Sequence, residues 1–387
     1  MDKKTLFINA DIIFPHCVLS NCYLTTTGHL IEDFGEMASC PPTTGYDKIY
    51  DLKNRRYISP GFIDLHIHGV AGADVMDGTA TALKTLSQIL PKEGTTSFLA
   101  TTITSPTKKI SQAIENIAHF HSYKGAKILG IHLEGPFINR HQAGAQPKGD
   151  IQEPNPELFS YWQSLSQNRI KLVTYAPEMD SNQKLLHQII ADGAIPSIGH
   201  SEATYEQVET VHSYGVSHMT HLFNGMLGIH HREIGTAGAA LLLDSFTAEI
   251  IADGRHISPE MIQLLLKVKG YQNLILITDS MRAKHMEDGD YELGGQTVHL
   301  QSGVATLVDG TLAGSILKMN DAIKNIRHFT GIALHEAIHM ATVNPAKKIG
   351  HFHCIGSIDR GKEADLVILD KELNVIDTFC KGERMFS

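Results

Sequence analysis

Long apolar runs, excess positive charge and cysteine are all scarce in this 387-residue sequence. No apolar run approaches the roughly 18 residues that a membrane-spanning helix needs, so we expect no membrane partner. Lysine and arginine total 33 against 42 aspartates and glutamates, and the net charge of −9 argues against nucleic-acid binding. The five cysteines contain no C-x-x-C pair, so reduced structural thiols are expected.

Histidine, by contrast, is abundant. The sequence has 23 histidines, and imidazole is both the commonest metal ligand and a frequent general base. Apolar residues make up 42% of the chain and charged residues 19%, a balance that allows a large buried core. Most of the histidines are expected to be surface or packing residues, and their positions in the fold decide which are functional.

From residue 61 onward, short apolar segments alternate with segments of helical periodicity. Helices are predicted to open at Ser258, with Pro259 in the first turn, and to span residues 334–341. The alternation is typical of a parallel sheet. Eight strands predict an α/β fold with a closed parallel barrel of the TIM type, and an open doubly wound sheet is the alternative. The strand candidates are residues 61–68, 95–101, 128–133, 170–175, 195–199, 217–221, 246–252 and 274–278.

The two ends of the chain carry β-type segments that are too short to bury a core separately. We therefore expect residues 1–58 and 352–387 to pair into one small β-sandwich domain. Residues 59–351 form the predicted catalytic barrel.

Metal-ligand residue types fall at the carboxyl ends of five predicted strands, where the active sites of such barrels lie. Together they offer nitrogen and oxygen ligands for one divalent ion or a close pair, and zinc, iron and manganese are all admissible. An alternating strand places the first two histidines on one face. The residues are His66, His68, Glu134, His200, His221 and Asp279.

A metal in such a site supplies reactive hydroxide near neutral pH, so hydrolysis is the predicted chemistry. Asp279 is the candidate acid–base, because a carboxylate beside the attacking water can take its proton and pass it to a leaving amine. A role as a plain metal ligand is the alternative, and Asp279 could fill both roles.

Two loops near the same rim carry a different kind of group. His231, Arg232 and His256 form a cationic set on an otherwise acidic chain, and Asp253 precedes His256. Because arginine favours bidentate contact with phosphate or carboxylate, an anionic substrate group fits here. A solvated loop with a local pairing of Arg232 and Glu233 is the alternative.

Several motifs together resemble those of the amidohydrolase superfamily and, within it, the N-acetylglucosamine-6-phosphate deacetylase family. They include P-G-F-I-D-L-H-I-H-G from residue 60, L-E-G-P-F from 133, G-H-S from 199, T-H-L-F-N-G-M from 220 and T-D from 278. This resemblance runs along almost the whole chain. It implies release of acetate from N-acetylglucosamine 6-phosphate, a small amino-sugar phosphate, in a cytoplasmic step of amino-sugar catabolism and cell-wall recycling.

The resemblance also implies roles for single residues. Glu134, His200 and His221 match the main metal ligands, and Asp279 matches the acid–base. The family is commonly homodimeric, with the arginine matching Arg232 reaching into the neighbouring site. Positions that match or adjoin the substrate-binding residues are Ala145, Gln146, Asn224, Gly225, His231, Arg232, Asp253, His256, Leu312, Ala313 and Gly314.

Two features distinguish this chain within the family it resembles. It keeps His66 and His68, which some members replace, so we expect two metals rather than one. The family often has Gly-Ala-His where this chain has Gly144-Ala145-Gln146. Gln146 can donate a hydrogen bond but carries no charge, which leaves its part in polarising an acetyl carbonyl open.

Three other functions are open from the sequence. Another amidohydrolase reaction, on a cyclic amide or by deamination of a ring, needs no phosphate-binding arginine. Deacetylation of N-acetylgalactosamine 6-phosphate differs at one hydroxyl of the substrate. A non-catalytic barrel would lack metal ligands or the acid–base, and this chain keeps all of them.

Overall fold

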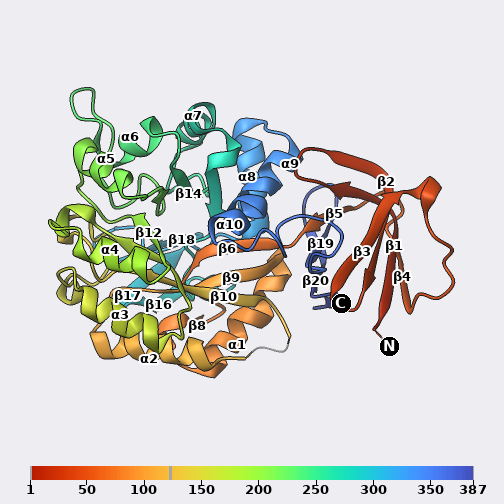
Figure 1. The fold of residues 1–387 in the computed structure, drawn as a ribbon, viewed down its shortest axis with the longest axis horizontal. Helices are drawn as coiled ribbons and strands as arrows, with labels where there is room; N and C mark the ends of the chain where they lie inside the picture. Colours follow the sequence, from red (N-terminus) through yellow and green to blue (C-terminus); the bar gives the residue numbers. More distant parts are fainter. Residues whose placement is uncertain (1, 122–123, 387) are drawn as a thin grey trace.

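Eight parallel strands form the centre of the computed structural model, which describes residues 2–121 and 124–386 (Figure 1). Every predicted barrel strand is present, and each pairs with the next along the chain. These strands are rich in β-branched and apolar residues, as expected for strands covered on both faces. They are β6 (Phe62–Ile67), β9 (Thr95–Thr102), β10 (Lys127–Glu134), β11 (Ile170–Tyr175), β12 (Ile195–Ile198), β13 (His218–Met219), β14 (Thr247–Ile251) and β15 (Leu274–Ile277).

The first and last strands of the sheet meet, which closes the barrel. Ile67 and Ser280 form a parallel bridge, and the backbone N–H of Asp279 donates to the carbonyl of His66 at 2.8 Å. Beneath them the Thr278 hydroxyl donates to the buried Asp64 carboxylate at 2.5 Å. The closed barrel is therefore confirmed over the open sheet.

Helices surround the barrel. Helix α7 begins as predicted: the Ser258 side chain accepts from the N–H of Met261 at 3.3 Å, and Pro259 occupies the first turn. No helix among residues 2–121 and 124–386 is long and apolar enough to span a membrane. The α-helices are α1 (Ala80–Ile89), α2 (Thr107–His119), α3 (Pro156–Leu165), α4 (Lys184–Ala191), α5 (Tyr205–Ser213), α6 (Gly235–Leu242), α7 (Pro259–Lys269), α8 (Met319–Thr330), α9 (Leu334–Ala341) and α10 (Val343–Lys348).

Both ends of the described chain lie in a small β domain beside the barrel (Figure 1). The N-terminal strands are β1 (Lys4–Ile13), β2 (Val18–Thr27), β3 (Leu30–Glu36), β4 (Lys48–Asp51) and β5 (Tyr57–Pro60). The C-terminal strands are β19 (Leu366–Leu369), β20 (Val375–Cys380) and β21 (Glu383–Arg384). Antiparallel pairing of β5 with β19 joins the two sets, which confirms that the two ends form one domain.

The strands of this small domain form one branched sheet, because β1 pairs with β2, β4 and β5. Phe7 on β1 nevertheless packs edge-on against Phe379 on β20, with ring centroids 5.1 Å apart. These strands are not neighbours in the sheet, so the sheet folds over its own apolar core. The exact limits at residues 58, 59, 351 and 352 stay a prediction, and residues 1 and 387 lie outside the described chain.

A small antiparallel sheet between β15 and α8 was not predicted. Its strands are β16 (Gly289–Leu293), β17 (Gln296–Gln301) and β18 (Val304–Thr306), and it has a separate core that includes Leu293, Val298 and Ala313. Arg282 at its base contacts Asp77 at 2.9 Å and Glu292 at 3.0 Å. Asp77 lies just beyond the β7–β8 hairpin (Gly69–Val70 and Ala73–Asp74), so this contact ties the insertion to the barrel rim.

Candidate metal centre

The side chains that the sequence singled out as ligands converge at the carboxyl ends of the strands. Glu134, at the end of β10, lies at the centre of this group. Its Oε1 lies 3.2 Å from Nε2 of His200 and 3.1 Å from Nε2 of His221. Its Oε2 lies 3.3 Å from Nε2 of His68, and Oε1 lies 3.4 Å from Nε2 of His66. One carboxylate therefore adjoins four imidazoles.

Asp279 completes the cluster on the side that faces the cavity. Its Oδ1 lies 3.2 Å from Nε2 of His68 and 3.5 Å from Nε2 of His66. The side chain of Asp279 is 13% exposed against 3% for Glu134, so Asp279 is the more accessible carboxylate. Asp279, His200 and His221 all have positive φ, at 46°, 49° and 27°. Such backbone is uncommon outside glycine and gathers at functional sites.

Main-chain carbonyls orient two of these imidazoles. Nδ1 of His200 lies 2.8 Å from the carbonyl of Gln142, and Nδ1 of His68 lies 3.3 Å from the carbonyl of Thr101. A carbonyl only accepts, so each ring carries its proton on Nδ1 and turns an unprotonated Nε2 to the cluster when neutral. This is the arrangement that metal-binding histidines use.

The charges of the cluster also favour a cation. Burial raises the pKa of Glu134, but His66, His200 and His221 outweigh it and hold the pKa well below the usual value. Burial lowers the pKa of His68, yet hydrogen bonds and charges from Asp279 and Glu134 raise it to about 9. The carboxylates thus draw positive charge into a site that solvent barely reaches, and a divalent ion supplies such charge.

The donor set fits a divalent metal. Two groups of possible ligands share Glu134: His66 and His68 on one side, His200 and His221 on the other. Nε2 of His66 is buried and has no hydrogen-bond partner among residues 2–121 and 124–386. The carboxylates of Glu134 and Asp279 lie 3.4 Å and 3.5 Å from it, so a metal ion among these groups would give this atom a partner. Imidazole nitrogens and carboxylate oxygens suit one or two first-row ions.

A cavity of about 230 Å³ opens above the cluster. Gln146 lies in its wall, but its side chain also donates to Oε2 of Glu134 at 2.7 Å and accepts from the N–H of Thr104 at 2.8 Å. The structure therefore gives Gln146 a contact that the sequence did not suggest: it orients Glu134. The predicted substrate residues that line this cavity are Ala145, Gln146, Asn224, Gly225, His256, Leu312 and Gly314.

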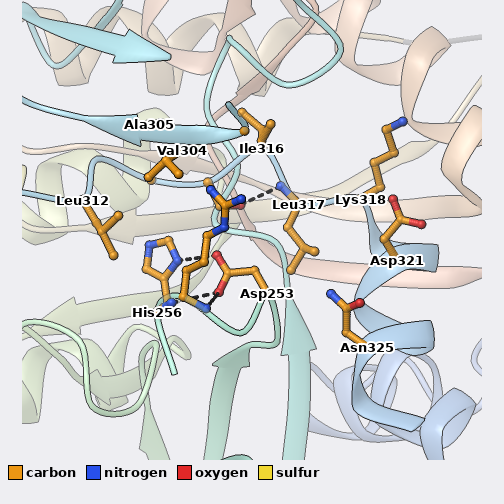
Figure 2. Close-up of a pocket in the computed structure, with 14 residues that line it drawn as sticks. Asp253, His256, Val304, Ala305, Leu312, Ile316, Leu317, Lys318, Asp321 and Asn325 are labelled. Atoms are coloured by element: carbon orange, nitrogen blue, oxygen red, sulfur yellow. Dashed lines mark hydrogen bonds and ion pairs between the residues drawn. The ribbon is translucent and has the colours of Figure 1, made fainter. Parts of the chain in front are cut away.

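A second cavity of about 320 Å³ adjoins the first and shares His256, Leu312 and Gly314 with it. Figure 2 shows Asp253 and His256 linked on one side of this cavity, with Lys318 on the other. The Asp253 carboxylate lies 2.7 Å from Nδ1 of His256. Burial lowers the pKa of His256, but Asp253 more than offsets this and raises it. His256 therefore brings a hydrogen-bond donor to the boundary between the two cavities.

Three predicted residues lie elsewhere. Ala313 is buried in the core of the inserted sheet, and its N–H donates to the carbonyl of Ala305 at 3.0 Å. His231 and Arg232 lie on an exposed loop beside a separate surface pocket. Nη1 of Arg232 is 3.0 Å from Nε2 of His231. Within a single chain, these two residues do not line the cavity above the candidate metal ligands.

The sequence did not single out the residues that support the ligands. One of them is His132, on β10 two residues before Glu134. Its ring nitrogens lie 3.1 Å from the carbonyl of Leu65 and 2.7 Å from the Thr174 hydroxyl. Burial is the main cause that lowers its pKa to about 3, so His132 is a neutral interior residue. Glu249 was also missed, although a lone glutamate within an apolar strand is a signal.

Comparison with known families agrees with this geometry. A profile of the amidohydrolase family matches residues 57–385, which span the whole barrel and the C-terminal strands. The chain belongs to the amidohydrolase family. The superfamily resemblance predicted from the motifs is thereby confirmed.

This amidohydrolase is 46% identical to N-acetylglucosamine-6-phosphate deacetylase of Bacillus subtilis (strain 168), over 100% of this chain and 98% of that protein. It is 35% identical to N-acetylgalactosamine-6-phosphate deacetylase of Escherichia coli O157:H7, over 86% and 88%. The crystal structure of N-acetylglucosamine-6-phosphate deacetylase from Pasteurella multocida matches with a TM-score of 0.92 at 32% identity, covering 98% and 99%. The amidohydrolase therefore has deacetylase relatives along its full length.

Proposed function

We propose that this amidohydrolase hydrolyses the acetamide of N-acetylglucosamine 6-phosphate to glucosamine 6-phosphate and acetate. The observation that carries the proposal is the Glu134-centred cluster at the base of a cavity, with Asp279 lining that cavity. The 46% identity to the deacetylase of Bacillus subtilis, along the whole chain, supports the substrate.

In the proposed reaction, His66, His68, Glu134, His200 and His221 would hold a divalent metal, which would supply the activation of water and of the acetyl carbonyl. Zinc, iron and manganese fit the ligands, and we propose two ions per chain. Asp279 takes a proton from the attacking water as the oxygen of that water bonds to the carbonyl carbon. Asp279 then gives that proton to the sugar nitrogen as the C–N bond breaks, which yields acetic acid and the amine. The remaining acid proton passes to the amine, so the products leave as acetate and glucosamine 6-phosphate with a protonated amino group.

The sugar phosphate is proposed to lie in the cavity above the cluster. Asn224, Gly225 and His256 line its wall and offer polar contacts, and Leu312 and Gly314 come from the loop that follows the inserted sheet. We propose that Arg232 completes the phosphate site of a neighbouring chain in a homodimer. Its loop is exposed, and the exposed side chains Ile229 and Leu242 lie beside it, which suits an interface between chains.

The same proposal places the enzyme in the cytoplasm, as its resemblance to deacetylases of amino-sugar catabolism and cell-wall recycling implies. N-acetylgalactosamine 6-phosphate is the second candidate substrate, because a relative at 35% identity has that name.

The test is acetate release by protein of known metal content, supplied in parallel with N-acetylglucosamine 6-phosphate, N-acetylgalactosamine 6-phosphate and unphosphorylated N-acetylglucosamine. We expect fast turnover of the first substrate and little of the third. Faster turnover of the galactosamine compound would change the assigned sugar. No acetate from any of the three by metal-loaded protein would overturn the deacetylase function.

A further inference from the structure

Glu249 is a carboxylate inside the barrel, beneath the metal ligands, that the proposed reaction does not use. It lies on β14 and is fully buried. Its Oε2 is 3.1 Å from Nδ1 of His66 and 3.4 Å from the backbone N–H of His221. Its Oε1 is 3.3 Å from Nε2 of His218. Glu249 thus contacts two of the candidate ligand residues from the side away from the cavity.

The proton positions around Glu249 follow from its neighbours. Nδ1 of His218 lies 2.7 Å from the Thr247 hydroxyl. The carbonyl of Ser217, 3.2 Å from that hydroxyl, is its other possible acceptor. Because an ionised Glu249 only accepts, His218 carries its proton on Nε2 and donates it to Glu249, and its unprotonated Nδ1 accepts from the Thr247 hydroxyl at the shorter of the two distances.

This order of donors leaves one role for His66. An ionised Glu249 accepts the Nδ1 proton of His66, so a neutral His66 turns an unprotonated Nε2 toward Glu134 and Asp279. His68 and His200 have main-chain carbonyls at their Nδ1 atoms instead. His66 is therefore the ligand whose orientation depends on an ionised side chain, and a carboxylate partner makes an imidazole a stronger metal ligand.

We propose that Glu249 is a positioning residue of the metal centre: it fixes the tautomer of His66, its negative charge makes that imidazole a stronger ligand, and it so sets the affinity of the ion position formed by His66, His68 and Glu134. The proposal rests on the metal part of the proposed function and is independent of the substrate. The position formed by Glu134, His200 and His221 depends on it less, because the contact of Glu249 there is to the backbone of His221.

The test is metal binding by Glu249→Gln. The amide oxygen can still accept from His66 and from the backbone of His221, so the shape is kept while the charge is lost. The matched control is Glu93→Gln, which removes the charge of another fully buried glutamate. Glu93 contacts Lys284 and none of the candidate ligands. Metal-free protein is titrated with Zn²⁺ against a chelating indicator, and bound metal is counted by elemental analysis.

We expect two ions in the wild type. In Glu249→Gln the dissociation constant of one ion should rise by about 10- to 100-fold while that of the other stays near its wild-type value. Glu93→Gln should bind both ions normally. Unchanged affinity for every bound ion in Glu249→Gln, or equal weakening in both variants, would overturn the proposal.

If Glu249→Gln does not fold, a measurement on the wild type still tests the proposal. Nitrogen-15 NMR of zinc-loaded protein should show His66 protonated at Nδ1, and protonation at Nε2 would overturn the proposal. Acetate release is followed separately with the same samples. Its absence from a wild type that binds two ions would overturn the deacetylase function and leave the role of Glu249 standing.

Discussion

Two buried carboxylates, Glu93 and Glu134, are balanced in different ways. Glu93 precedes β9 and is fully buried, with Nζ of Lys284 at 2.7 Å and Nε2 of His285 at 3.4 Å. Glu134 is buried among imidazoles, which are positive only when they carry an extra proton. Beside Glu93 the protein itself supplies a cation, the ammonium group of Lys284. The cluster around Glu134 can take its positive charge from a bound ion instead. At Glu134 the surrounding imidazoles and the adjoining cavity thus favour a cation that comes from outside the chain.

Removal of the metal should show the largest difference between the Glu134 cluster and the Glu93–Lys284 pair. We expect dialysis against a chelator to abolish acetate release, because the chemistry proposed for the cluster needs the ion, and Zn²⁺, Fe²⁺ or Mn²⁺ to restore it. Neither Glu93 nor Lys284 is a candidate metal ligand, so the ion pair between them should stay intact when the metal is removed. Full activity in protein with no bound metal by elemental analysis would contradict the comparison.

Asp279→Asn tests the acid–base within the cluster. The amide keeps the shape of the side chain but cannot accept the proton, so turnover should fall on the order of 100-fold or more. The melting temperature of the zinc-loaded variant should stay close to that of the wild type. Near-normal turnover would show that another group moves the proton.

Glu93→Gln should have the reverse profile, with reduced stability and normal turnover per folded molecule. It leaves Lys284 buried without its counter-charge, which costs about 3–5 kcal/mol in the free energy of unfolding. Chemical denaturation measures this difference. A variant as stable as the wild type would show that the pair contributes nothing.

The stability difference at Glu93 should also depend on pH. Burial raises the pKa of Glu93, but Lys284 and His285 more than offset this and hold it below its usual value. A lowered pKa stabilises the fold above the unfolded value of about 4.3, and this stabilisation is lost as the pH falls through the folded value. The gap between Glu93→Gln and the wild type should therefore be full at pH 7 and shrink below about pH 4.

Gln146→Ala is expected to have the smallest effect. It removes the donor to Oε2 of Glu134, and partners of metal ligands are typically worth tenfold or more, so turnover should fall about tenfold. Gln142→Ala is the matched control on the same loop. The side chain of Gln142 contacts Glu202, while its main-chain carbonyl, which the substitution keeps, accepts from His200. Equal losses in both variants would point to a general disturbance of the loop.

The eight strands, and the meeting of the six candidate ligands, could be predicted because a closed parallel barrel brings strand ends to one rim, whatever the loops between them do. The inserted sheet could not, since its strands are short and largely polar, and they bury residues such as Leu293 only against the barrel and each other. Glu249 and Glu93 were missed for a related reason: their partners His66 and Lys284 lie far away in the sequence.

The seam of the barrel has a consequence for the order in which the protein can be assembled. His66 and His68 come from the strand on one side of that seam, and Asp279 follows the strand on the other. A ribosome therefore makes one half of this ligand set long before the other half. The complete cluster can form only after the eighth strand has left the ribosome and paired with the first. An ion bound there would therefore link the first and the last barrel strands to be synthesised.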